Sequence, residues 1–373
     1  MAKKVGILTA GSDCPGLNAT IRAFGKAARS TYGMTMIGFK DGFRGLIEDH
    51  TVDLSGDALS NILTAGGTIL GTSRDLPHEF VVNGEKQDRT DDAVKVYKQN
   101  GLDALVCIGS METQETAHRL TQAGLNLLTI PKSANNDVAM TDATIGFDTA
   151  QDIATEAIDR LHSTANSNHR IIIVEIMGKD VGWLTLGAGV ASGADVILIP
   201  EIPYDIGKIS DAILERNKAG KMFSIVAVAE GANSSELVAF FERSAKINRK
   251  VHSDEAQEQS QERMAELKKK YTGQTLLLAN RLEETTGIES RITILGYLLR
   301  GGAPSARDRV LATHLGTCAA DLVADNKFGV MVAYRDGDAV PVPLEDVIGK
   351  EKSVPLDHPL ILGARHVGTD FGD

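Results

Sequence analysis

Short apolar segments alternate with amphipathic ones along most of the chain. The apolar segments are four to six residues long and rich in Val and Ile. Because they lack the polar alternation of a half-exposed strand, they predict strands buried on both faces of a parallel sheet. They are Val5–Thr9, Met36–Phe39, Ala104–Ile108, Leu127–Ile130, Ile171–Ile176, Val196–Ile199, Ile225–Val228 and Val330–Ala333.

Between these segments, apolar residues recur with the spacing of a helix. Ile153, Ala157 and Leu161 form one such stripe, and a second one runs from Val310 to Leu322. Alternating strands and helices predict an α/β fold with parallel sheets. Ligands in such folds bind at the carboxyl ends of the strands, so the turns from strand to helix are the candidate sites.

Residues 233–275 break this alternation. They are polar and charged, with a weak helical stripe at Met264, Leu267 and Tyr271. This pattern predicts an exposed helical excursion from the domain that carries it.

Composition narrows the class of protein. A chain of 373 residues is long enough for two domains, and its formal net charge of -11 disfavours nucleic acid and anionic membranes as partners. Three widely spaced cysteines give no disulfide or zinc pattern. No signal peptide or long apolar span is visible, so a cytoplasmic location is expected.

Several glycine-rich turns follow the predicted strands in a fixed order. The first, Gly11–Gly16, joins a strand to a helix, and its small residues let backbone N–H groups approach an anion. In order, the motif segments are ILTAGSDCPGLNATIRA, GGTILGTSRD, TDATIGFDTA, HRIIIVEIMGKDVGW, AEGA and RITILGYLLRGGAPSARDR. Together they resemble the phosphofructokinases from residue 5 to about residue 320.

This resemblance implies two similar three-layer α/β/α domains with an interdomain cleft. The donor side would comprise residues 1–147 and about 299–349, and the sugar-phosphate side about 148–298 and 350–373. Members of the family transfer a phosphoryl group from ATP or pyrophosphate to the 1-hydroxyl of fructose 6-phosphate with Mg²⁺. Such transfer requires positioned cations and a carboxylate that takes the hydroxyl proton.

The sugar-phosphate positions of the family are largely kept. Guanidinium groups bind phosphate oxygens in pairs, and the resemblance gives this role to three arginines. The resemblance also implies that Arg170 and Arg291 reach into the cleft of a neighbouring subunit. The implied substrate-binding residues are Ser133, Arg170, Met177, Gly178, Glu230, Arg291, Tyr297 and Arg300, and Lys179 replaces the usual arginine after Met177 and Gly178.

The donor and metal motif departs from the family. Gly11, Ser12, Gly109 and Glu112 align with donor-phosphate positions, but Met111 stands where the magnesium-linked aspartate belongs. A thioether is a poor ligand for Mg²⁺, which prefers oxygen, so no metal ligand is expected at this position. Glu112 replaces the Gly of ATP-dependent members or the Asp of pyrophosphate-dependent ones, which disfavours ATP.

The catalytic motif departs as well. Asn135 replaces the aspartate that acts as the base, and an amide cannot accept a proton at a useful pH. Asp137 and Arg74 keep the residue types of the family, and Arg74 aligns with an arginine that neutralises the transferring phosphoryl group. Loss of a positioned base lowers a rate by about 10²–10⁴.

Three hypotheses follow. The chain is a regulatory or structural subunit that binds fructose 6-phosphate in a homo-oligomer, or in a hetero-oligomer with an active paralogue. Alternatively, it is an active 6-phosphofructokinase that uses Mg²⁺ with pyrophosphate, or less readily ATP. The third possibility is a binding protein for another phosphorylated metabolite. The first hypothesis follows from two replacements that both affect the transferring phosphoryl group.

Overall fold

The computed structural model describes residues 2–240 and 274–373. The chain divides into two compact units, each built from two stretches of sequence. Unit 1 comprises Met1–Asp152 and Tyr297–Lys352, and unit 2 comprises Ile153–Gly296 and Ser353–Asp373. The expected borders after residues 147, 298 and 349 lie a few residues from these divisions.

Unit 1 contains a seven-stranded sheet in the order β13-β12-β7-β6-β1-β2-β3. The five central strands are parallel, as the apolar runs predicted, but β3 and β13 pair antiparallel at the two edges. The strands are β1 (Lys4–Thr9), β2 (Thr35–Phe39), β3 (Thr51–Asp53), β6 (Ala104–Gly109), β7 (Leu127–Pro131), β12 (Val330–Arg335) and β13 (Asp338–Pro343). A separate hairpin pairs β4 (Phe80–Val82) with β5 (Glu85–Gln87).

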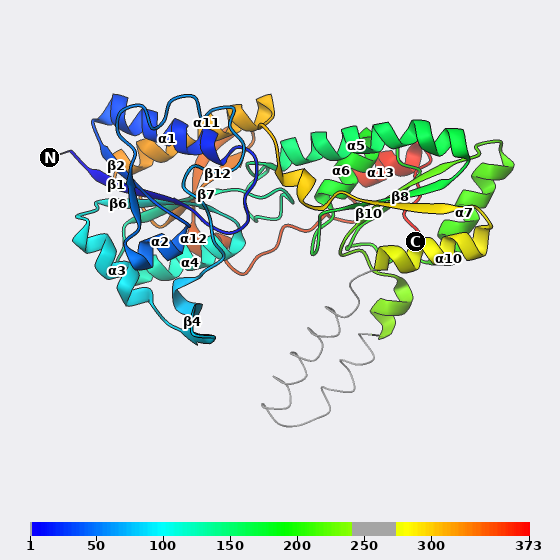
Figure 1. Ribbon diagram of the computed structural model, residues 1–373, viewed down its shortest axis with the longest axis horizontal. Coiled ribbons are helices and arrows are strands. Elements are labelled where there is room, and N and C mark those ends of the chain that lie inside the picture. The colour runs from blue at the N-terminus through cyan, green and yellow to red at the C-terminus, as the bar shows by residue number, and fades with distance from the viewer. Residues whose placement is uncertain (1, 241–273) are drawn as a thin grey trace, which may run out of the picture. The chain divides into compact units, whose positions relative to one another are not determined.

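Helices cover both faces of this sheet and enclose two apolar cores (Figure 1). On one face, α1 (Leu17–Tyr32) and α11 (Ala306–Ala324) pack Phe24 and Leu315 onto the strands. The opposite face is covered by α2 (Phe43–Glu48), α3 (Thr90–Gln99), α4 (Met111–Gln122) and α12 (Leu344–Val347). Unit 1 is therefore a three-layer α/β/α domain.

Unit 2 contains a four-stranded parallel sheet in the order β11-β8-β10-β9. Its strands are β8 (Ile171–Ile176), β9 (Val196–Leu198), β10 (Ser224–Ala229) and β11 (Ser290–Ile294). Figure 1 shows α7 (Ile206–Lys218) and α10 (Gln274–Thr286) on one face, and α5 (Phe147–Asn168), α6 (Trp183–Ala191) and α13 (Pro359–His366) on the other. Unit 2 repeats the layered plan with a smaller sheet.

All eight predicted strands are present, whereas five other strands among residues 2–240 and 274–373 were missed. The missed strands β3, β4, β5, β11 and β13 are short or lie at an edge, where polar residues interrupt the apolar pattern. Within the predicted excursion, residues 235–240 are helical. Residues 241–273 lie outside the described part of the chain. No helix among the described residues is long and apolar enough to cross a membrane.

Candidate functional site

Three loops meet at the carboxyl edge of the unit 1 sheet, each directly after a central strand. The backbone N–H of Lys132 after β7 donates to the carbonyl of Gly109 at the end of β6, at 3.1 Å. Gly11, after β1, has a φ of 81° that favours glycine. A Cβ atom on Gly11 would lie 3.3 Å from Ser110 Oγ and 3.4 Å from Lys132 Nζ. The predicted donor residues Gly11 and Gly109 therefore lie in adjacent loops.

Two cations contact Ser12 within these loops. Lys132 is 2% exposed, and its ammonium group donates to the main-chain oxygen of Ser12. Burial lowers the pKa of Lys132. Arg74 is exposed and donates from Nη2 to Ser12 Oγ at 3.1 Å. Sequence reasoning did not assign a role to Lys132, because a lysine after a strand is usually exposed.

The loop after β7 places two side-chain oxygens inside the protein without partners. Ser133 Oγ accepts the N–H of Asn135 at 3.1 Å, and Asn136 has a φ of 55° and donates to the Asp142 carbonyl at 3.3 Å. Asn135 Oδ1 and Asp137 Oδ1 are both buried, and neither has a hydrogen-bond partner among the described residues. Because buried polar atoms are normally paired, these two oxygens are available to a ligand.

The residue in the metal position is part of the core. Met111 is the first residue of α4, and its side chain packs against the apolar cluster that contains Leu120 and Val347. Glu112 is exposed in the first turn of the same helix. Among the described residues, no group of three or more His, Cys, Asp or Glu side chains could hold a metal. At the metal position itself the thioether of Met111 offers no oxygen ligand, whereas Mg²⁺ binds through one or two carboxylates together with substrate phosphates.

Arg300 and Tyr297 lie beside the first loop of unit 1. The Arg300 guanidinium carbon lies 4.3 Å from the Tyr297 ring centroid, and Nη2 lies 3.7 Å from Asp13 Oδ1. Arg300 Nε is buried and has no hydrogen-bond partner among the described residues. Unit 1 thus gathers Gly11, Ser12, Arg74, Ser133, Asn135, Asp137, Tyr297 and Arg300 from the sequence-predicted set, together with Gly109 and Glu112.

At the carboxyl edge of the unit 2 sheet, Met177 and Gly178 follow β8 and Glu230 follows β10. Gly178 has a φ of 146°, and a Cβ there would lie 2.7 Å from the Val181 carbonyl oxygen. The N–H of Gly231 donates to the Gly178 carbonyl at 3.0 Å, which ties the two loops together. Desolvation raises the pKa of the Glu230 carboxyl, although its side chain reaches the surface.

Arg170 and Arg291 lie at the opposite, amino edge of the same sheet. Arg170 precedes β8 and Arg291 is the second residue of β11, and both contact the carboxylate of Glu289. The six residues of β8 separate Arg170 from Met177, a distance of roughly 20 Å at the usual rise of a strand. Arg170 and Arg291 therefore cannot reach a ligand held at Met177 and Glu230 of the same chain. Sequence reasoning missed Glu289, because its contact depends on the pairing of β11.

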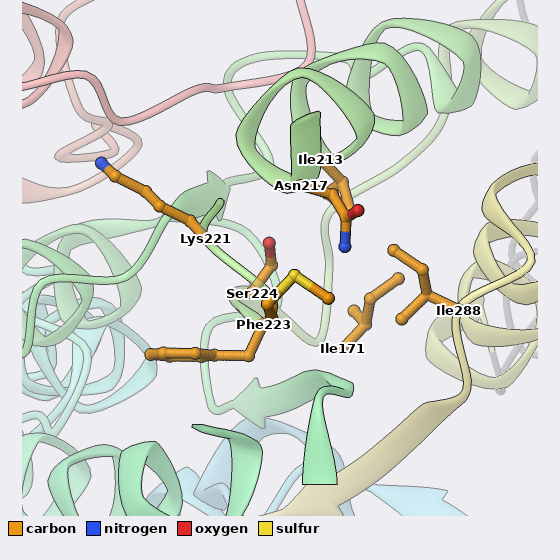
Figure 2. Close-up of a pocket in the computed structure, with 8 residues that line it drawn as sticks. Ile171, Ile213, Asn217, Lys221, Phe223, Ser224 and Ile288 are labelled. Atoms are coloured by element: carbon orange, nitrogen blue, oxygen red, sulfur yellow. The ribbon is translucent and has the colours of Figure 1, made fainter. Parts of the chain in front are cut away.

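Two hollows lie away from these loops. The smaller, about 150 Å³, borders the amino edge of the unit 2 sheet, where Figure 2 shows Ile171, Ile213 and Ile288 around it and Lys221 extending away. Small-molecule sites begin at about 300 Å³, so this hollow is too small for a sugar phosphate. The larger, about 860 Å³ on the same basis, is lined by Arg29, Met36 and Asp53 in unit 1 and contains none of the predicted site residues.

Comparisons with known proteins agree on one family. Residues 4–323 match the family model described as phosphofructokinase. The chain is 54% identical to an ATP-dependent 6-phosphofructokinase of Propionibacterium freudenreichii, with 100% of both chains covered. It is 42% identical to a pyrophosphate--fructose 6-phosphate 1-phosphotransferase of Amycolatopsis methanolica, with 94% of this chain and 96% of that one covered.

A solved structure shares the fold at lower identity. The pyrophosphate-dependent phosphofructokinase of Marinobacter aquaeolei superimposes with a TM-score of 0.78 and 19% identity, covering 99% of this chain and 88% of that one. The α/β architecture predicted from the resemblance is therefore confirmed.

Proposed function

The chain belongs to the phosphofructokinase family, and from this premise we propose that it binds fructose 6-phosphate but is strongly impaired in phosphoryl transfer. Its role is then that of a regulatory or structural subunit in an oligomer. The cations that a phosphoryl group requires are present in unit 1, where Arg74 and Lys132 both contact Ser12. The residues present therefore favour binding of the phosphorylated substrate, but not transfer of the phosphoryl group.

The observation that carries the proposal is the amide of Asn135. Its Oδ1 is buried and has no hydrogen-bond partner among the described residues, at a position that aligns with the base of the family. An amide oxygen can accept a hydrogen bond from a sugar hydroxyl, but it cannot remove the proton. Without a base, the expected rate is about 10²–10⁴ lower than that of an enzyme that has one.

The packing of Met111 supports the same proposal. Its thioether contributes to the apolar cluster beneath α4, so an oxygen ligand is lost and an apolar contact is gained. A methionine that fills a core gap has a structural reason to be there. Reversion to aspartate would remove that apolar contact from a partly buried position.

The amino-edge arginines favour a role in an oligomer. Arg170 and Arg291 are roughly 20 Å from Met177 along β8, so within one chain they do not share its ligand. The family resemblance assigns them to a neighbouring subunit. A chain that lacks its own base can still supply these guanidinium groups to an active partner, which is the sense in which we propose a regulatory or structural subunit.

The main test is an activity assay with two donors. Purified protein is mixed with fructose 6-phosphate and Mg²⁺, with either pyrophosphate or ATP, and formation of fructose 1,6-bisphosphate is followed by a coupled reaction. We expect turnover far below about 1 s⁻¹, the low end of ordinary enzymes. Turnover above that value with either donor would refute the impairment. A rise in melting temperature with fructose 6-phosphate is expected independently, because a ligand that binds the folded state stabilises it.

The role as a subunit needs a separate test. The chain is co-expressed with an active phosphofructokinase of the same cell, and a stable complex is sought by tandem affinity purification. We expect a mixed oligomer whose affinity for fructose 6-phosphate differs from that of the active partner alone. If the two chains do not co-purify and the kinetics of the partner are unchanged, the subunit role is wrong.

A second candidate is an active 6-phosphofructokinase that uses pyrophosphate. The observation in its favour is Asp137, whose Oδ1 is buried without a partner two residues from Asn135. Buried Lys132 adds a cation where a compact anion would lie. One relative named for pyrophosphate, at 42% identity, adds weight to this candidate, whereas the relative at 54% identity is named ATP-dependent. The pyrophosphate arm of the assay distinguishes it from the first.

A further inference from the structure

Sheet register brings three charged side chains together at the amino edge of unit 2. Strands β8 and β11 are parallel, with Ser290 opposite Ile171 and Arg291 opposite Ile172. This register places Glu289, the residue before β11, across from Arg170. Glu289 and Arg291 are two residues apart, so their side chains project to the same face. We call Arg170, Glu289 and Arg291 the amino-edge cluster.

Each carboxylate oxygen of Glu289 binds a different arginine. Oε2 accepts from Arg170 Nε at 2.5 Å, and Oε1 accepts from Arg291 Nη2. The side chains of Arg170, Glu289 and Arg291 are 32%, 39% and 55% exposed. Solvent and solutes therefore reach all three, so a dissolved anion can compete for the same guanidinium groups.

The charges of the cluster do not balance. Two guanidinium groups face one carboxylate, which leaves an excess of one positive charge on a chain whose net charge is -11. The hydrogen bond from Arg170, with the charge of Arg291, holds the pKa of Glu289 below its usual range. Glu283 adds a second carboxylate beside the cluster, where its Oε2 accepts the backbone N–H of Ser290 at 2.9 Å, so the excess of one positive charge belongs to Arg170, Glu289 and Arg291 alone.

We propose that Glu289 is an internal competitor that occupies Arg170 and Arg291 until a phosphate group displaces it. This inference rests on the proposed function, because it concerns arginines that the family resemblance assigns to a sugar phosphate. The carboxylate sets the affinity of the pair. It keeps both guanidinium groups oriented. An incoming anion must therefore bind these two groups more tightly than the carboxylate of Glu289 does.

This competition selects for doubly charged anions. A phosphate ester carries close to two negative charges at neutral pH and presents three acceptor oxygens, whereas Glu289 presents two oxygens and one charge. Exchange of Glu289 for a phosphate therefore gains charge and hydrogen bonds. Exchange for a carboxylate of a metabolite gains neither. The cluster thus discriminates against singly charged anions without a closed pocket.

The experiment compares Glu289→Gln with the matched variant Glu284→Gln. Glu284 is an exposed carboxylate on α10, so both variants change the net charge equally. Binding of inorganic phosphate and of fructose 6-phosphate to the full chain is measured by ³¹P NMR titration, with acetate as the singly charged competitor. For Glu289→Gln we expect the affinity for phosphate to rise about three- to tenfold, because the two exposed ion pairs with Arg170 and Arg291 no longer compete with phosphate. Acetate should then compete measurably.

Three outcomes are decisive. Equal effects of Glu289→Gln and Glu284→Gln would overturn the proposal, because general electrostatics would then explain both. If Glu289→Gln gains no affinity for phosphate, the proposal is also overturned. The same holds if the gain in affinity persists in the double variant Arg170→Gln/Glu289→Gln, which lacks one of the two guanidinium groups. If Glu289→Gln raises the affinity for inorganic phosphate but neither wild type nor any variant binds fructose 6-phosphate, Glu289 does compete with phosphate, and the proposed sugar-phosphate function is wrong.

Discussion

Two groups of cations in this protein differ in how they are held. In unit 1, Lys132 is 2% exposed and its ammonium group contacts the main-chain oxygen of Ser12. In unit 2, Arg291 is 55% exposed and contacts the side chain of Glu289. A buried cation against the backbone keeps its position as long as the loop is folded. An exposed cation against a flexible carboxylate exchanges partners at little cost.

The comparison suggests a division of roles. In the function we propose, the unit 1 loops are a fixed receptor for the phosphorylated substrate, with Arg74 and Lys132 for its phosphate and the unpaired oxygens of Asn135 and Asp137 for its hydroxyl groups. The amino-edge cluster, as we propose, is an adjustable contact in which a phosphate group displaces Glu289. Substitutions should therefore have large effects in unit 1 and small effects on stability in the amino-edge cluster.

The largest effect is expected from restoration of the acidic groups in unit 1. The variant Met111→Asp/Asn135→Asp should raise the rate of phosphoryl transfer about 10²–10⁴-fold, because a positioned carboxylate can then take the hydroxyl proton. The two-donor assay measures this rate. Asn83→Asp, in the exposed turn between β4 and β5, is the control and should leave the rate unchanged. An unchanged rate in the double variant, with its melting temperature preserved, would show that the loss of transfer has another cause.

A second prediction concerns a buried charge near the same loops. Burial lowers the pKa of Lys352 from 10.5 to about 8, and its Nζ donates to the Asp142 carbonyl at 2.7 Å. The folded protein therefore releases this proton between pH 8 and 10.5 while the unfolded chain retains it. Stability should rise with pH across that interval by on the order of 2–3 kcal/mol relative to Lys352→Met, and the cost of burial is fully present below pH 8.

Urea unfolding of wild type and Lys352→Met at pH 7 and pH 9.5 measures this difference. Lys350→Met, an exposed lysine two residues away, should show no such dependence. Parallel stability curves for wild type and Lys352→Met would contradict the prediction.

A third prediction separates the two groups of cations by binding. Lys132→Met should weaken binding of pyrophosphate about tenfold, the usual scale for loss of one charge-assisted contact. Calorimetric titration measures the affinity, and the exposed lysine of Lys95→Met serves as the control. Equal affinities in all three proteins would mean that Lys132 positions the loop without contacting the anion.

The smallest effect is expected on stability in the amino-edge cluster. Glu289→Gln and Arg170→Gln should each shift the melting temperature by less than about 2 °C, because exposed ion pairs contribute little. Differential scanning fluorimetry in low and high salt measures the shift. A loss of several degrees would show that the amino-edge cluster stabilises the fold. The arginines of unit 2 would then be held as firmly as Lys132 in unit 1.

The central architecture was predictable because buried parallel strands have a simple pattern. Val106, Ile173 and Val226 lie in continuous apolar runs that a sheet covered on both faces requires. The loops at the carboxyl edge of unit 1 were equally predictable, since glycines and polar residues follow those runs directly. Lys132 is the exception, because a lysine after a strand is usually exposed and only the fold shows its contact with Ser12.

Edge strands and long-range contacts were not predictable from pattern alone. The segment of β11 contains Arg291 and Thr293 between apolar residues, so its pairing with β8 could not be distinguished from a loop. The contact between Glu289 and Arg170 spans 119 residues of sequence. It exists only because the register of β8 and β11 aligns them.

The sequence by itself determined the strands of the sheets, the family resemblance and the replacements at Met111 and Asn135, because residue type and local spacing are sufficient for these. Tertiary structure alone decided which charges meet. It placed Glu289 beside Arg170 and Lys132 inside a loop contact, since strand pairing and burial depend on residues far apart in the chain.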